Sequence, residues 1–132
     1  MSETPNTDPT DRLVSIACQA CREKKGSDLV VLEVGRLTTL AEVFILCTGN
    51  THRQVKAIVD EVQIQLKRAG FTLYGEEGAM EGFWVLLDYG DVVVHVFERE
   101  TRFFYNLERL WGEAPRRVLP EDGEQAASAA GE

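Results

Sequence analysis

A chain of 132 residues is the length of one ordinary domain, and a hydrophobic fraction of 44% allows a packed core without a metal or disulfide. The net charge of −8 lacks the surplus of lysine and arginine that binds a phosphate backbone, so little direct nucleic-acid contact is expected. No apolar run approaches the roughly 20 residues that cross a membrane. Residues 1–11 read as neither a secretory signal nor a transit peptide, so we expect a cytoplasmic protein without a membrane segment.

The predicted elements begin after a polar segment, residues 1–10, that we expect to be disordered. From Asp11 onward, apolar residues recur at helical spacing and form an apolar stripe, which predicts a helix that ends at Gly26. Residues 28–34 (DLVVLEV) are a strand candidate. Residues 42–48 (EVFILCT) form a second predicted strand, and because this segment is nearly all apolar we expect it to be covered on both faces.

A second helix is predicted after the break at residues 49–51. Thr51 and Gln54 have the spacing of a capping box, in which each side chain satisfies a free backbone N–H at the helix start. Gly70 fits the end of this helix. Residues 71–74 are then a short strand candidate, and residues 75–82 (GEEGAMEG) are predicted to be a glycine-rich acidic loop.

Two further strands, at residues 83–88 and 91–97, flank the dipeptide Tyr89-Gly90, and a last helix is predicted from about residue 102 to 111. Residues 113–132 contain five acids and two bases and lose the hydrophobic pattern, so they are predicted to form a disordered acidic tail. The order is therefore α-β-β-α-β-β-β-α within a single domain at residues 11–112. Such interleaving predicts an α/β fold in which a mixed β-sheet is layered with helices.

The predicted hairpin has two unlike faces. A two-residue loop at Tyr89-Gly90 would place Asp88 opposite Asp91 and Trp84 opposite His95. Side chains alternate along a strand, so one face would be wholly apolar and would pack on the helices. That face comprises Phe83, Val85, Leu87, Val92, Val94 and Val96, whereas the other face mixes Trp84, Leu86, Asp88, Asp91, Val93, His95 and Phe97.

The mixed face has two interpretations. Like charges placed opposite each other destabilise a hairpin, so Asp88 and Asp91 favour a cation within the protein or on a partner. Alternatively, both aspartates accept hydrogen bonds from the turn backbone. Similarly, Trp84 and His95 are either a structural pair or partner contacts. Because charge complementarity speeds encounter, an acidic surface suits a basic partner.

The three cysteines are Cys18, Cys21 and Cys47, an odd number that favours a reducing compartment. Cys18 and Cys21 lie inside the first predicted helix, whereas a redox pair starts a helix after a strand. No paired spacing of cysteine or histidine supplies the two further ligands that zinc needs. We therefore expect no metal here, and Cys21 to be a core residue on the apolar stripe.

Several blocks resemble, in the same order, the ribosomal silencing factor family, also called Iojap-like proteins, over roughly residues 11–111. They are DLVVLEV, EVFILCTGNTHRQVKAIVDEV and GFWVLLDYGDVVVHVFERETRFFYNLERLW. The most specific parts are WVLLDYGDVVVHVF and the pattern R-x-x-Y-x-L-E-x-L-W. The resemblance implies a nucleotidyltransferase-like α/β sandwich that binds the large ribosomal subunit at large-subunit ribosomal protein fourteen. It also implies a translational repressor that sterically blocks joining of the small subunit, without catalysis or cofactor, and homodimers occur in the family.

Positions that match the family motif imply the partner-binding residues, namely Trp84, Asp88, Tyr89, Asp91, His95, Tyr105 and Glu108. Two alternatives remain. A nucleotidyltransferase-like enzyme would need two carboxylates at i and i+2 on one strand to hold Mg²⁺, whereas Asp88 and Asp91 are placed on either side of a turn, so we expect no catalytic residue. An acidic adaptor for another basic protein is permitted by the composition, and only the family resemblance argues against it.

Overall fold

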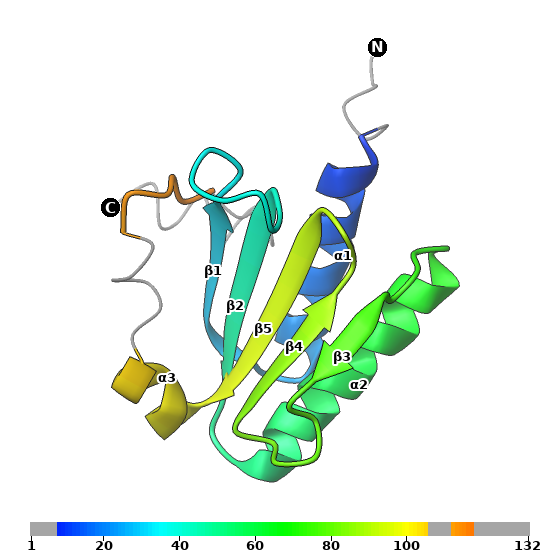
Figure 1. Ribbon diagram of the computed structural model, residues 1–132. Helices are drawn as coiled ribbons and strands as arrows, with labels where there is room; N and C mark the ends of the chain where they lie inside the picture. The colour runs from blue at the N-terminus through cyan, green and yellow to red at the C-terminus, as the bar shows by residue number, and fades with distance from the viewer. Residues whose placement is uncertain (1–7, 106–111, 118–132) are drawn as a thin grey trace, which may run out of the picture.

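The computed structural model describes residues 8–105 and 112–117 (Figure 1). Within these residues, five strands form one sheet in the order β1-β2-β5-β4-β3, in which β2 and β5 are parallel and the other neighbours are antiparallel. The predicted α/β fold, with its mixed sheet and its order of elements, is confirmed. The elements are α1 (Pro9–Glu23), β1 (Ser27–Glu33), β2 (Val43–Gly49), α2 (His52–Arg68), β3 (Gly75–Glu77), β4 (Trp84–Asp88), β5 (Val92–Glu98) and α3 (Arg99–Tyr105).

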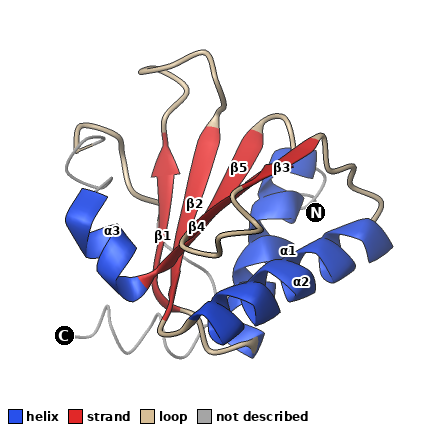
Figure 2. Ribbon diagram, turned by 60° about the horizontal axis from the view of Figure 1, so that its bottom comes forward, coloured by secondary structure: helices blue, strands red, loops and turns tan. Residues whose placement is uncertain are grey.

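Two helices cover one face of the sheet. Both views show α1 and α2 packed side by side on the same side of the sheet, which is the rear in Figure 1, while α3 lies apart from them at the end of β5 (Figures 1 and 2). All seven residues of β2 are buried, which confirms the prediction that both faces of this strand are covered. In the part of the chain that the structure describes, no helix is long and apolar enough to cross a bilayer.

The core between the helices and the sheet is built from the predicted apolar stripes. Cys21 belongs to this core as predicted, and Cys18 is buried with it. A hydrogen bond with Cys47 and burial raise the pKa of the Cys21 thiol, so this cysteine stays protonated and unreactive. Further members of this helix-side core are Leu13, Val14, Ala17, Val55, Ile58, Val62, Leu66, Val85, Leu87, Val92, Val94 and Val96.

The start of α2 has the predicted cap with one difference. Thr51 is the N-cap, and its Oγ1 accepts a hydrogen bond from the Gln54 N–H at 3.1 Å. The Gln54 side chain accepts in return from the N–H of Asn50, at 2.6 Å, one residue earlier than in a standard capping box. Its amide also donates to the carbonyls of Lys24 and Lys25, so this residue joins the start of α2 to the α1–β1 turn.

The third strand is not where the sequence predicted it. Residues 71–74 lie outside any strand, and β3 is formed by Gly75–Glu77, inside the predicted loop. It pairs antiparallel with β4, with Glu77 opposite Leu86. All three residues of β3 are exposed, so this short edge strand lacks the apolar alternation by which a strand is recognised. Phe71 and Leu73, which suggested the earlier strand, are partly buried against the helix-side core instead.

The chain after α3 returns to the sheet and lies along β1. The N–H of Glu33 donates to the carbonyl of Pro115, and the N–H of Arg117 donates to that of Val31, both at 2.8 Å. Ala114 is buried, and the Arg117 guanidinium contacts carboxylates of α1 and β1. The predicted tail boundaries at residues 10 and 113 thus both fall within the described fold, and the remainder of each tail lies outside the described residues.

Candidate partner-binding site

The β4–β5 hairpin turns one residue later than predicted. The N–H of Tyr89 donates to the carbonyl of Val92 at 2.9 Å, so the two central residues are Gly90 and Asp91. Gly90 has a φ of +90°, a conformation that favours glycine and suits the first central position of a tight hairpin turn. The predicted loop at Tyr89-Gly90 was therefore wrong.

The shifted turn changes every cross-strand pair but not the two faces. Trp84 lies opposite Phe97 instead of His95, and His95 lies opposite Leu86. Each residue meets a partner two positions further along β5. A shift of two residues preserves the alternation of side chains, so the predicted division of the hairpin into an apolar and a mixed face is confirmed.

The apolar face lies in the helix-side core, with one exception and one addition. Phe83 was predicted to belong to it, but this residue precedes β4 and is 47% exposed. Tyr89, a predicted partner-binding residue, is only 6% exposed and packs within the helix-side core. Burial, with a contribution from Glu76, raises the pKa of the Tyr89 hydroxyl to about 12. Tyr89 therefore lies on the opposite side of the sheet from Trp84 and His95.

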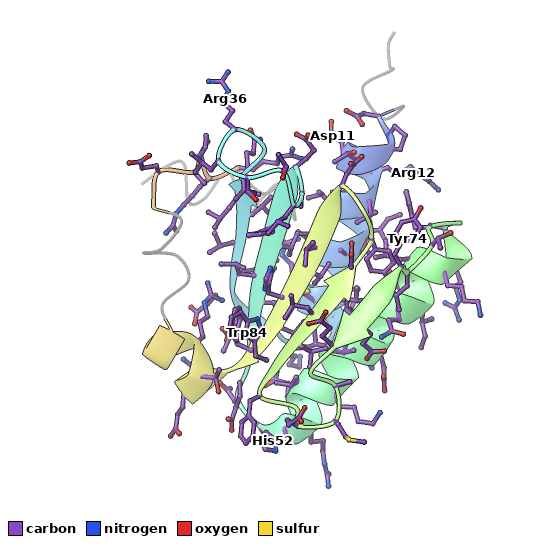
Figure 3. All side chains as sticks on the ribbon, in the orientation of Figure 1. Asp11, Arg12, Arg36, His52, Tyr74 and Trp84 are labelled. Carbon is purple, nitrogen blue, oxygen red and sulfur yellow. The ribbon has the colours of Figure 1, made fainter. Side chains whose placement is uncertain are left out.

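The face of the sheet opposite α1 and α2, here called the outer face, carries a cluster of aromatic rings. The Nε1–H of Trp84 donates to Nδ1 of His95 at 3.2 Å, and its indole stacks on Phe97 with centroids 5.2 Å apart. Phe44, from the neighbouring strand β2, meets the imidazole edge-on at 4.7 Å. Trp84 is partly buried beside the junction of β5 and α3 (Figure 3). The predicted Trp84–His95 interaction thus exists, along a diagonal of the hairpin.

His95 is a neutral imidazole with a defined tautomer. It is 5% exposed, and burial lowers its pKa to about 4, so the ring is uncharged at neutral pH. Its Nδ1 accepts the Trp84 hydrogen bond, which assigns the proton to Nε2. Within the described residues, Nε2 is buried and has no hydrogen-bond partner. The ring thus presents an unused N–H donor beneath the outer face.

A hollow of about 350 Å³ lies over these residues. Its wall is mainly apolar, and Glu77 and Asp88 supply its charged groups. Asp88 Oδ1 accepts a hydrogen bond from the N–H of Gly90 at 2.8 Å, which confirms for this residue the interpretation as a turn-capping aspartate. The lining residues are Leu40, Phe44, Gly75, Glu77, Trp84, Leu86, Asp88, Val93 and His95.

A second hollow, of about 590 Å³, adjoins the same tryptophan from the side of the β3–β4 loop and α3. It is lined by Gly78, Glu81, Phe83, Trp84, Glu98, Glu100 and Thr101. Together the two hollows contain five carboxylates, and no lysine or arginine is among their described lining residues. The charged side chains that line the hollows with Trp84 are therefore all acidic.

The structure brings together only part of the predicted site. Trp84, Asp88 and His95 line one hollow. Asp91 instead lines a different cavity, near the start of α1, so the prediction that Asp88 and Asp91 face each other was wrong. Tyr105 is the last residue of α3, and its side chain, like the whole of Glu108, lies outside the described residues.

Sequence reasoning missed four residues of the hollow, namely Leu40, Phe44, Gly75 and Glu77. Phe44 pairs with Val93 across the parallel strands β2 and β5, so alternation would have placed it on the outer face if the strand order had been known. Glu77 belongs to the edge strand that was predicted as a loop. For Leu40, an exposed loop residue, the sequence contains no comparable signal.

Comparison with known proteins places these features in a family. Residues 7–132 match the family model described as "Ribosomal silencing factor during starvation". The chain is 43% identical to the ribosomal silencing factor of Bacillus subtilis over 103 residues, which cover 78% of this chain and 87% of that protein. It is 45% identical to the silencing factor of Chromobacterium violaceum over 97 residues, covering 74% and 80% of the two chains. A crystal structure of a C. violaceum protein superposes with a TM-score of 0.75 at 43% identity, covering 77% of this chain and 85% of that one. The chain belongs to the ribosomal silencing factor family.

Proposed function

We propose that this protein represses translation by binding the large ribosomal subunit at large-subunit ribosomal protein fourteen and blocking the joining of the small subunit. The outer face around Trp84 is the proposed contact surface. The family supports a role at the ribosome, and the named relatives quoted above are silencing factors rather than enzymes. Occupancy of the joining surface requires no catalytic group, so the domain acts as a steric block.

The observation that carries this proposal is the environment of Trp84. A partly buried tryptophan between two hollows has the features of an interface anchor, since aromatic side chains that fill or border pockets dominate many protein interfaces. The five surrounding carboxylates suit a basic partner and disfavour the phosphate backbone of ribosomal RNA. A basic ribosomal protein therefore fits this face better than RNA does.

The direct test is a subunit-joining assay with purified components. The protein should sediment with large subunits and lower the yield of joined ribosomes when it is added before the small subunit. It should be absent from the fraction of ribosomes assembled beforehand, because the small subunit then covers its site. Equal recovery with free large subunits and with assembled ribosomes would contradict the blocking mechanism.

The charges of the hollow should control the rate of association. The double variant Glu77→Gln with Asp88→Asn removes both carboxylates of the smaller hollow, while the amide introduced at position 88 keeps an oxygen for the turn N–H. We expect association with the large subunit to slow roughly three- to tenfold at low salt, with a weaker dependence on ionic strength. Stopped-flow or surface-plasmon measurements over a salt series would quantify both changes.

Asp91→Asn is the matched control for this experiment. It makes the same chemical change at an exposed aspartate of the same hairpin, but this residue lines the separate cavity near α1. Its association rate should remain close to that of the wild type. The double variant removes two charges and Asp91→Asn removes one. If Asp91→Asn slowed association by half as much on a logarithmic scale, long-range net charge rather than the hollow would account for the effect.

A further inference from the structure

We propose that the Nε2–H of His95 donates a hydrogen bond to an uncharged oxygen of the partner that occupies the hollow beside Trp84. His95 would then be the residue that decides which chemical group enters this hollow. The inference rests on the proposed function for the identity of the partner, and it adds the kind of atom that the partner must supply.

The Nε2–H of His95 is a buried donor that the described part of the chain leaves unsatisfied. Buried side-chain nitrogens in folded proteins are almost always hydrogen-bonded, and one that is not requires an explanation. In His95 the other ring nitrogen is already occupied by Trp84, so the imidazole is held in one orientation with its proton on Nε2. Among the described residues, no acceptor reaches this nitrogen. An acceptor on a bound partner would remove the cost of the unpaired N–H.

His95 lies in the wall of the hollow. Phe44, Leu86 and Val93 supply apolar surface beside it. Nε2 has almost no accessible surface in the free protein, so the partner group must enter the hollow and displace a neighbouring side chain to reach it. A hydrogen bond made in such a water-poor site discriminates strongly between groups that can accept it and groups that cannot.

The charges around the hollow limit which chemical group of the partner can accept the His95 hydrogen bond. Glu77 and Asp88 repel an anion, so a carboxylate or phosphate is disfavoured as the acceptor for His95. A lysine or arginine head has no acceptor atom to offer and is better placed against these two carboxylates. The remaining choice is an uncharged oxygen, from a hydroxyl, amide or main-chain carbonyl. The partner thus presents this oxygen at the centre of the contact and basic residues around it.

Two variants separate this role from a purely structural one. His95→Asn places an amide close to the position of Nδ1, so it can still accept from Trp84 but has no donor at the ε position. In His95→Gln the side-chain amide N–H reaches the position of Nε2, but no acceptor atom lies at the position of Nδ1 for the Trp84 N–H. We expect His95→Asn to bind the large subunit about tenfold more weakly than the wild type, and His95→Gln to retain most of the affinity.

The opposite order would overturn the proposal. If His95 serves only to orient Trp84, His95→Asn should bind like the wild type and His95→Gln should bind weakly. Equal losses in both variants would indicate a packing role and would also contradict the hydrogen bond. If the wild type binds but neither variant changes, the proposed function stands and this inference fails. If the wild type itself does not bind large subunits, the proposed function has failed first.

A measurement on the wild-type protein tests the same hydrogen bond without relying on variants that fold poorly. In protein labelled with ¹⁵N-histidine, the Nε2–H resonance of His95 should move downfield when purified large-subunit ribosomal protein fourteen is added, because a hydrogen bond deshields the proton. The reference is the spectrum of the free protein, because the other histidine, His52, contacts Phe83 and Glu98 of the second hollow and is itself expected to respond. An unchanged His95 resonance in a saturated complex would overturn the proposal whatever the variants show.

Discussion

Replacing Trp84 with alanine is expected to weaken binding to the large subunit by about 2 kcal/mol or more, which is roughly thirtyfold in Kd. The indole borders both hollows of the outer face, so its removal takes away the shared wall of the proposed contact. It also deprives His95 of the N–H that holds the imidazole in its orientation. Both losses act on the same surface, so the effect should exceed that of any single charge variant.

Equilibrium binding to purified large subunits, measured with a fluorescently labelled protein, would quantify this loss. Tyr74→Ala is the matched control, since Tyr74 is 71% exposed and lies beside β3 at the far edge of the sheet (Figure 3). That variant removes an accessible aromatic ring outside both hollows and should bind like the wild type. A folded Trp84→Ala protein with unchanged affinity would assign Trp84 to the core and remove it from the interface.

Acidification from pH 6.5 to 4 is expected to lower the free energy of unfolding by about 3 kcal/mol through His95 alone. In the unfolded chain this histidine binds a proton near its ordinary pKa of 6.5, whereas in the folded protein burial lowers its pKa to about 4. Between these values the unfolded state binds more protons, so stability falls as the pH falls. Below pH 4 both states are protonated and this contribution becomes constant.

Urea unfolding of the wild type and of His95→Asn at pH 7, 5.5 and 4 would isolate this effect. The carboxylates titrate in both proteins, so the difference between the two curves reports His95. We expect the wild type to lose its advantage over the variant progressively as the pH is lowered. Parallel curves over this range would show that the imidazole is charged or accessible to water in the folded state. Protonation would also place a hydrogen on Nδ1, which ends its role as the acceptor for Trp84.

The sequence predicted the faces of the hairpin better than its pairs. Val85 and Leu87 were assigned to the core, and Trp84 and His95 to the outer face, because alternation depends only on the parity of the register. The pairs depend on the turn. Both common two-residue hairpin turns need a positive φ at the first central position, which is costly for Tyr89 and free for Gly90. The turn rules therefore favour the Gly90-Asp91 loop, and Gly90 does have a positive φ.

The hollow itself could not be predicted from the hairpin alone. It requires Phe44 from β2 and Glu77 from β3, and these strands lie on opposite sides of the hairpin in the sheet order. Only the tertiary arrangement places Glu77 next to β4, because β3 is too short and too polar to be recognised as a strand. The location of Tyr89 was also predicted wrongly. Its position in the family motif suggested a partner contact, whereas its side chain, which precedes the late turn, packs in the helix-side core.

The segment that returns along β1 has a consequence for self-association. Strand edges with free N–H and carbonyl groups are templates for pairing with another chain, and natural proteins cover or shorten them. Here residues 115–117 hydrogen-bond to β1, and the opposite edge is the three-residue polar strand β3. A chain shortened to end before Ala114 would expose the edge of β1 and would be expected to aggregate. Within the described residues, extension of the sheet is therefore disfavoured along the second half of β1 and at β3, and a face or a helix is the expected contact of a homodimer.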